Sequence, residues 1–204
     1  MNTENSTRTP LVPITDDQSF RELKHSLEQT STQLDELPNF IRVLAHSPAA
    51  LKAYLVADRA LAGGQNTPQQ REQIALAVAE INGCSYSLSA HHALGRRLSL
   101  SEEAIRLARN ATALDPQTRA MLRFTQAVVL QRGEISQNEF QSLGTADFTD
   151  AEIIEIIAGI GLNIFTNYFN LLAKTPVDFP LILPGVEASG PACRWRSAKL
   201  TGVC

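Results

Sequence analysis

The sequence predicts an all-α fold, for three reasons. Apolar residues recur at the three- and four-residue spacing of a helix, and the alternation typical of a strand is scarce. Helix-start signals, in which Ser, Thr or Asp precedes a Pro or a Glu/Gln, recur along the chain. Gly or Pro follows most of the apolar segments, where helices commonly end. With 204 residues, 44% of them hydrophobic, the chain can bury the core of one domain with extensions.

The N-terminal part divides at proline and glycine. A first amphipathic helix is expected over 18–33, where leucines and a phenylalanine share one face. Pro38 opens the short segment "NFIRVLAHS". Pro48 opens a longer one, which Gly63 ends. These signals predict three helices before the central part of the chain.

The central helices follow directly. "TPQQREQIALAVAEI" begins with a capping box made by Thr67 and Gln70. Residues 74–81 are apolar nearly all round, which predicts a buried helix. Gly83 interrupts this helix, and a second is expected to start at about Cys84.

The C-terminal part carries further capped helices. Asp115, Ser136 and Thr149 are the expected N-caps. The long helix that follows Thr149 is apolar over more of its surface than a small bundle needs, which indicates either an oligomer interface or a central core helix. In total we expect seven to nine helices, over approximately 18–33, 39–47, 49–62, 67–81, 84–97, 101–110, 115–132, 136–144 and 149–174.

Three parts of the chain are expected: an extension with one helix (1–37), an all-α domain (38–184) and a tail (185–204). The net charge is −3 with no block of basic residues, so no nucleic-acid partner is expected. The N-terminal segment lacks an apolar core, and the most apolar stretch, 156–165, is too short to span a bilayer. A cytoplasmic protein without membrane association is expected.

The stretch "NGCSYSLSAHH" carries the candidate chemistry. On a helix, Cys84, Ser87 and His91 lie at i, i+3 and i+7 and share one face. Cys84 would occupy the first turn, where free backbone N–H groups favour a thiolate. Ser87 and His91 are one turn apart, so a hydrogen bond between them is expected. His92 points away and is expected at the surface or in an interface.

Two carboxylates of the preceding helix, Glu72 and Glu80, flank its apolar stretch. A carboxylate beside a buried face must be paired or hydrogen-bonded. Both are therefore candidates for acid–base work with the thiol and imidazole. Glu80 has an alternative role, an ion pair with Arg96 or Arg97.

These residues resemble a known motif. "EQIALAVAEINGCSYSLSAHH" is similar to the core of the carboxymuconolactone decarboxylase and alkyl hydroperoxidase D-like (AhpD-like) family: a Glu twelve residues before a C-x-x-C, then three residues and a His. Glu72, Glu80, Cys84 and His91 match. "GLNIFTNYFNLLAKTPVDFP" is similar to the end of the peroxidase-related branch. The resemblance covers about 38–182.

The resemblance implies an all-α homo-oligomer, a trimer or a hexamer, without a cofactor. In redox members the second Cys is activated through the His and Glu, and it reduces organic hydroperoxides or exchanges with a dihydrolipoyl partner. Here that position is Ser87, which cannot form a disulfide. Cys84 oxidised to a sulfenic acid would need an external thiol, or Cys193 or Cys204, to resolve it.

Three hypotheses follow. The first is an AhpD-like antioxidant enzyme with hydroperoxide-reducing thiol chemistry at Cys84, assisted by Glu72 and His91. The second is a decarboxylase or lactone-processing enzyme that uses Glu72 and His91 without the cysteine. The third is a redox-inactive helical oligomer with a binding or scaffolding role. A zinc site fits poorly because adjacent histidines diverge on a helix, and a Ser87 hydrolase lacks a nucleophile-elbow sequence.

Overall fold

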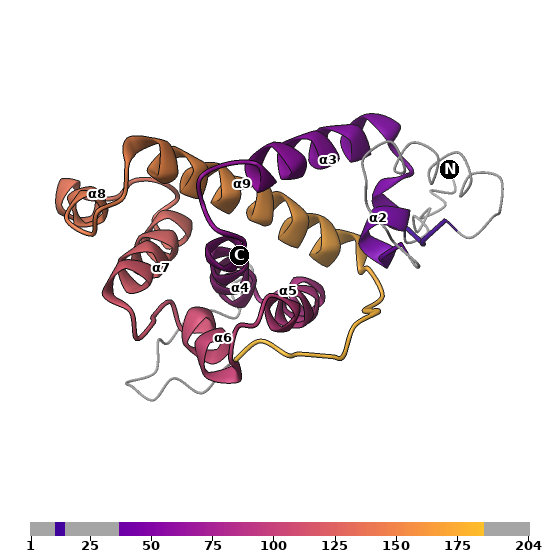
Figure 1. The fold of residues 1–204 in the computed structure, drawn as a ribbon. Helices are drawn as coiled ribbons and strands as arrows, with labels where there is room; N and C mark the ends of the chain where they lie inside the picture. The colour runs from indigo at the N-terminus through magenta and orange to yellow at the C-terminus, as the bar shows by residue number, and fades with distance from the viewer. Residues whose placement is uncertain (1–10, 15–36, 186–204) are drawn as a thin grey trace, which may run out of the picture.

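A computed structural model describes residues 11–14 and 37–185, and in this part the chain forms eight helices and no strand (Figure 1). The predicted helix 18–33, most of the predicted tail, and Cys193 and Cys204 lie outside the described residues, so the predicted division into three parts stays a prediction. The all-α prediction is confirmed for the described part. The helices are α2 (Asn39–Leu44), α3 (Pro48–Ala62), α4 (Pro68–Asn82), α5 (Ser85–Arg97), α6 (Glu102–Arg109), α7 (Pro116–Leu130), α8 (Gln137–Gly144) and α9 (Asp150–Ala173).

Four of the predicted N-caps are confirmed: Thr67, Asp115, Ser136 and Thr149. The side chain of Thr67 accepts a hydrogen bond from the backbone N–H of Gln70, whose own side chain accepts from Thr67 N–H. The same reciprocal capping box starts α8 and α9. The side chain of Asp115 caps α7 by accepting a hydrogen bond from Thr118 N–H. Each cap satisfies backbone donors that a helix start leaves free, so these boundaries are set locally by the sequence.

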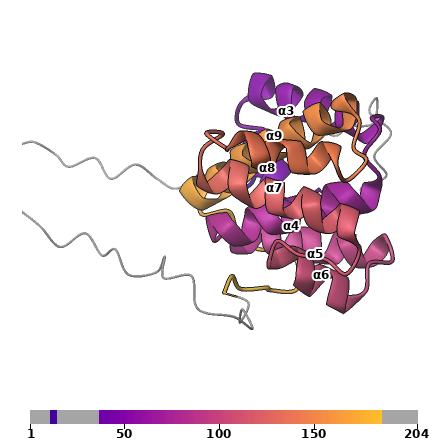
Figure 2. The same ribbon diagram turned by 90° about the vertical axis from the view of Figure 1, so that its left-hand side faces the viewer.

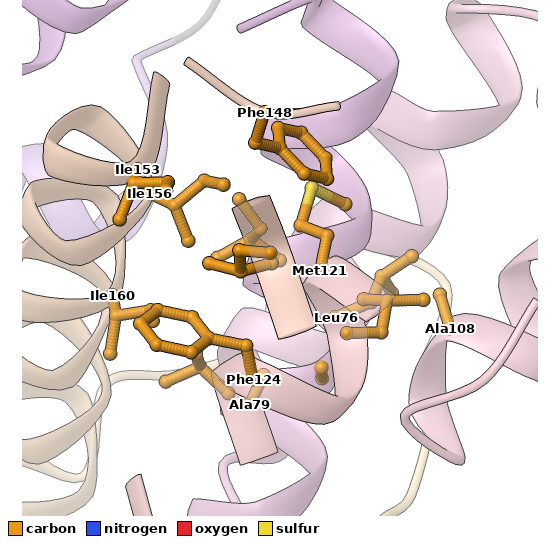
Figure 3. Close-up of a cluster of buried hydrophobic side chains, with 14 of the residues drawn as sticks. Leu76, Ala79, Ala108, Met121, Phe124, Phe148, Ile153, Ile156 and Ile160 are labelled. Carbon is orange, nitrogen blue, oxygen red and sulfur yellow. The ribbon is translucent and has the colours of Figure 1, made fainter. Parts of the chain in front are cut away.

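Helix α4 forms the centre of the domain, as its nearly uniform apolar surface predicts. It contacts α5, α6, α7 and α9, which surround it in Figure 1. Its residues 74–79 are buried. Figure 3 shows part of the cluster in which side chains from α4, α6, α7 and α9 converge. Buried aliphatic side chains of this kind each contribute about 1.5–3 kcal/mol to folding, which fixes α4 in place.

The helices lie in layers. Figures 1 and 2 both show α3 on one side of α9, with α4 beneath α9 and then α5 and α6. A second apolar cluster joins α2, α3 and the start of α5. It includes Phe40 of α2, Leu51 of α3, and Cys84 with Tyr86. The start of α5 is therefore held by α2 and α3 as well as by α4.

Helix α9 packs on α4 and exposes its other face. By length and composition alone its 24 residues could cross a membrane, with a mean hydropathy of 1.4 over an 18-residue window, and it is longer than the apolar stretch singled out in the sequence. Its buried residues include Thr166, Asn167 and Asn170, which suit a protein interior with polar contents better than a lipid environment. The core-helix interpretation is confirmed for the buried face.

Candidate functional site

The junction between α4 and α5 positions Cys84. Gly83 adopts a left-handed conformation (φ 68°), which lets the chain turn sharply after α4. Cys84 is the N-cap of α5 and precedes its first turn, one position earlier than predicted. Its sulfur accepts a hydrogen bond from Ser87 N–H, with an N–S distance of 3.5 Å. The side chain is only 1% exposed.

Ser87 interacts with Cys84 and not with His91. The Cys84 thiol donates to Ser87 Oγ over 3.2 Å, and both residues are buried. Within the described residues no hydrogen bond joins Ser87 to His91, so that prediction is wrong. The physical reason is that the serine hydroxyl already pairs with the sulfur, while the imidazole has a stronger acceptor elsewhere.

That acceptor is Glu72 of α4. His91 Nδ1 lies 2.8 Å from Glu72 Oε2, and the two side chains are 21% and 16% exposed. A carboxylate oxygen accepts, so Nδ1 donates in this bond. Nε2 is then the ring nitrogen left for a substrate. The structure thus brings together two of the residues that the motif singled out, from neighbouring helices.

A cavity of about 210 Å³ opens beside this pair. Glu72, His91 and Ser87 line it, whereas Cys84 is not among its lining residues. The remaining lining residues include charged side chains of α3 and α4 (Asp58, Arg71), aromatic rings (Phe40, Tyr54, Tyr86, Phe179) and polar side chains of α9 (Asn163, Thr166, Asn170). A small organic molecule fits such a mixed pocket.

Helix α3 adds two functional candidates that the sequence interpretation missed. Burial, followed by the negative charge of Glu72, raises the pKa of Asp58, and His91 and Arg71 partly offset this. The Asp58 residue as a whole is exposed and lies at the rim of the cavity, so the burial that raises its pKa is the partial desolvation of its carboxyl by the neighbouring protein atoms. Burial also raises the pKa of Tyr54 well above its ordinary value. The signal was the spacing of Leu51, Tyr54 and Asp58 on one face of α3.

Glu80 lies outside the cavity lining. It forms an ion pair with Arg109 of α6, with Nη2 2.9 Å from Oε2, and each side chain is 14% exposed. Its other oxygen accepts from Gly185 N–H. The alternative of an ion pair with an arginine is therefore observed, but the partner is Arg109. The predicted partner Arg96 pairs with Glu102 instead.

Two further observations concern the remaining polar residues. His92 Nε2 lies 3.1 Å from Glu102 Oε2, away from the cavity, as expected. In the part of the chain that the structure describes, no group of three or more His, Cys, Asp or Glu side chains is arranged to hold a metal ion. Among the residues that the motif singled out, the two interacting pairs are Glu72–His91 and Cys84–Ser87.

Comparisons with known proteins identify a family match over part of the chain and several proteins of similar fold. Residues 48–129 match the carboxymuconolactone decarboxylase family. The fold is similar to an AhpD-core peroxidase-related protein from Ralstonia eutropha JMP134 (TM-score 0.72, 23% identity, 84% of this chain and 94% of that one). It is also similar to a peroxidase-related protein from Silicibacter sp. TM1040, with a TM-score of 0.68 and 23% identity over 87% of this chain and 95% of that one.

The debrominase Bmp8 has the same fold (TM-score 0.71, 20% identity, 85% of this chain and 94% of that one). A search of curated proteins gave no match. The matched segment contains α4 and α5 with Glu72, Cys84, Ser87 and His91. Residues 48–129 therefore match the carboxymuconolactone decarboxylase family, and the fold of the described residues is similar to that of AhpD-like proteins.

Proposed function

We propose that the protein is an enzyme that moves a proton at a small organic acid, with His91 as the acid–base group and Glu72 as its partner. One observation carries the proposal: both residues line the cavity, whereas Cys84 does not. A histidine that a carboxylate holds at one ring nitrogen is a common acid–base arrangement. Arg71 lines the same cavity, and the one hydrogen bond that its guanidinium makes within the described residues goes from Nη1 to Asn66 O. The guanidinium therefore has donors left for a substrate carboxylate.

The chemistry fits a decarboxylase or lactone-processing enzyme. Loss of CO2 breaks the bond between the substrate carbon and its carboxylate and leaves the electron pair on carbon. Protonated His91 then delivers its Nε2 proton to that carbon, and water returns a proton to the ring. Glu72 accepts the Nδ1 hydrogen throughout and stabilises the imidazolium form. No cofactor enters this scheme.

The test measures CO2 release from carboxymuconolactone by the full chain and two variants. Cys84→Ser is expected to retain turnover, because its side chain does not line the cavity. His91→Gln keeps a hydrogen-bonding side chain but cannot carry the proton, so turnover should be lost. Equal rates for the unmodified protein and His91→Gln, or loss of turnover in Cys84→Ser alone, would overturn the proposal.

A second candidate is the hydroperoxide-reducing thiol chemistry predicted from the motif. The N-cap position of Cys84 and the backbone N–H bond to its sulfur favour it. The sulfur would attack the terminal oxygen of an organic hydroperoxide, releasing an alcohol and leaving a sulfenic acid. An external thiol or dihydrolipoyl group would then reduce it. The peroxide must reach a sulfur that is 1% exposed and lies outside the cavity lining.

Cumene hydroperoxide consumption in the presence of dihydrolipoamide separates the two candidates. Thiol chemistry requires that turnover disappear in Cys84→Ser. The scaffolding hypothesis receives less support, since it expects a pocket sealed by apolar side chains, whereas the cavity here has charged and amide groups on its walls. The cytoplasmic location stays a prediction.

We also propose that a second copy of the chain covers the outer face of α9, as expected for a trimer or hexamer. The exposed apolar side chains there repeat at helical spacing: Ile154, Ile157, Phe165, Tyr168 and Leu172. Tyr168→Glu should reduce the sedimentation coefficient. Val56→Glu is the control, because Val56 is an equally exposed apolar residue on α3. A monomeric unmodified protein would overturn this.

A further inference from the structure

The wall that α9 contributes to the cavity is polar, although the helix as a whole is apolar. Asn163, Thr166 and Asn170 lie at i, i+3 and i+7, so they share one face, and all three line the cavity. The opposite face carries the exposed apolar side chains. Over this stretch α9 therefore turns a polar face toward the cavity and an apolar face outward.

Two of the three side chains are already used within the helix. Asn163 Nδ2 donates to Gly159 O over 2.9 Å, and Thr166 Oγ1 donates to Asn163 O over 3.0 Å. Asn170 differs. Its Oδ1 is buried without a hydrogen-bond partner in the described part of the chain, and the residue is 4% exposed. Leaving a buried amide oxygen unpaired costs free energy, so such groups in native proteins call for a partner.

Asn66 also lines the cavity, and its side-chain oxygen also lacks a hydrogen-bond partner in the described part of the chain. Its Nδ2 donates to Glu152 O over 3.2 Å, which fixes the orientation of the amide. The Oδ1 atom is left buried and unpaired, on a residue that is 3% exposed. Both unpaired groups are acceptors. A ligand that satisfies them must donate a hydrogen bond, so a hydroxyl or N–H group fits and an ether or ester oxygen does not.

The aromatic lining of the cavity lies near Asn170 rather than near Asn66, because Phe40 contacts Phe169, the residue before Asn170, whereas Asn66 contacts Glu152 and Glu155 in the first half of α9. Phe40 makes edge-to-face contacts with Tyr54, at 4.9 Å between ring centroids, and with Phe169, at 5.6 Å. Phe40, Tyr54 and Phe179 line the cavity together with Asn170. Aromatic walls favour a flat ring, because a ring can pack against their faces and edges.

We propose that this end of the cavity is a binding subsite for a planar ring that bears a hydroxyl or N–H group, with Asn170 Oδ1 as the acceptor that selects it. The proposal rests on one observation: Asn170 Oδ1 is a hydrogen-bond acceptor without a partner, on a residue more than nine-tenths buried, in the wall of a cavity that aromatic side chains line. The inference concerns binding alone and is independent of the reaction proposed for His91.

Ligand-observed NMR on the full chain with three probes tests it. The probes are p-cresol, which donates; 4-methylanisole, which only accepts; and toluene, which does neither. p-Cresol should bind about threefold to tenfold more tightly than the other two, the contribution expected from one buried hydrogen bond. Absence of p-cresol binding, or equal affinities for the three probes, would overturn the proposal.

Asn170→Leu assigns the selectivity to the residue. Leucine has nearly the shape of asparagine, so the variant should bind all three probes alike and should be at least as heat-stable as the unmodified protein. Asn163→Leu is the matched control on the same wall, and it should keep the preference for p-cresol. A preference that persists in Asn170→Leu would contradict the proposal.

If Asn170→Leu does not fold, the side-chain amide resonances of the unmodified protein replace it. The Asn170 amide signal should shift with p-cresol and stay unchanged with toluene. An unchanged Asn170 signal with both probes would overturn the proposal.

Discussion

Glu72 and Glu80 lie on the same helix, α4, and are almost equally buried, with side chains 16% and 14% exposed. Burial therefore does not distinguish them. Their partners do: Glu72 meets a histidine over 2.8 Å, and Glu80 meets Arg109 over 2.9 Å. Only Glu72 lines the cavity. For these two largely buried carboxylates, the partner group therefore distinguishes a candidate catalytic role from a structural one.

The difference has a chemical cause. Histidine exchanges a proton near neutral pH, whereas arginine stays charged at any pH that the protein experiences. Arg109 also donates to Leu183 O over 2.8 Å, and Glu80 accepts from Gly185 N–H. The Glu80–Arg109 pair therefore fixes the chain after α9 against α4 and α6, and its function is to hold structure.

The largest expected effect separates the two carboxylates by rate. Glu72→Gln should lower turnover of a small organic acid by about 10²- to 10⁴-fold, because the imidazolium form of His91 loses its stabilising charge. Glu80→Gln should change turnover by less than about threefold. Steady-state kinetics of both variants under one set of conditions makes the comparison. Similar losses in the two variants would remove the distinction.

The next effect reverses the order and concerns stability. Glu80→Gln should lower the free energy of unfolding by about 2 kcal/mol, because Arg109 keeps its charge in a largely buried position without a counter-charge. Urea unfolding followed by circular dichroism measures this. The double variant Glu80→Met/Arg109→Met should recover much of the loss, since no lone charge is then left. A double variant less stable than either single variant would contradict this explanation.

Sequence-local physics accounts for what could be predicted. The capping boxes at Thr67, Ser136 and Thr149 involve residues three apart, so their geometry is contained in the sequence. The burial of α4 follows from its apolar surface. The shared motif gave the pairing of His91 with Glu72 in outline, but not the atoms that join them.

The rest depends on packing between distant segments. Asp58 and Tyr54 belong to the cavity because α3 packs against α9, which no local pattern encodes. The partner of Glu80 is 29 residues away on α6, rather than on the adjacent α5. Gly83 ends α4 as predicted, but α5 begins at Ser85, one residue later than expected, so Cys84 is its N-cap.

A smaller effect tests the structural side of the comparison. Ser89 Oγ accepts from Ile182 N–H over 2.9 Å and donates to Ser85 O over 2.8 Å, so it holds the same segment as Glu80. Ser89→Ala should cost about 1 kcal/mol and speed hydrogen exchange at Ile182. Glu80→Gln should speed exchange in this segment too, and Glu72→Gln should not. Faster exchange in Glu72→Gln would mean that the two carboxylates share one role.

The smallest effect concerns Asp58, whose pKa in the folded protein is raised by burial and by the charge of Glu72. A raised pKa means that ionising Asp58 destabilises the folded state, so its penalty is absent below the unfolded pKa of about 3.9 and grows as the pH rises through the folded value. Asp58→Asn should therefore be more stable than the unmodified protein at neutral pH, with the gain disappearing as the pH falls toward about 3.9. Urea unfolding at several pH values measures the gain.

In a Glu72→Gln background the gain should shrink, because one source of the raised pKa is gone, whereas a Glu80→Gln background should leave it unchanged. Equal gains in both backgrounds would show that Glu72 exerts no more influence on the cavity rim than Glu80 does.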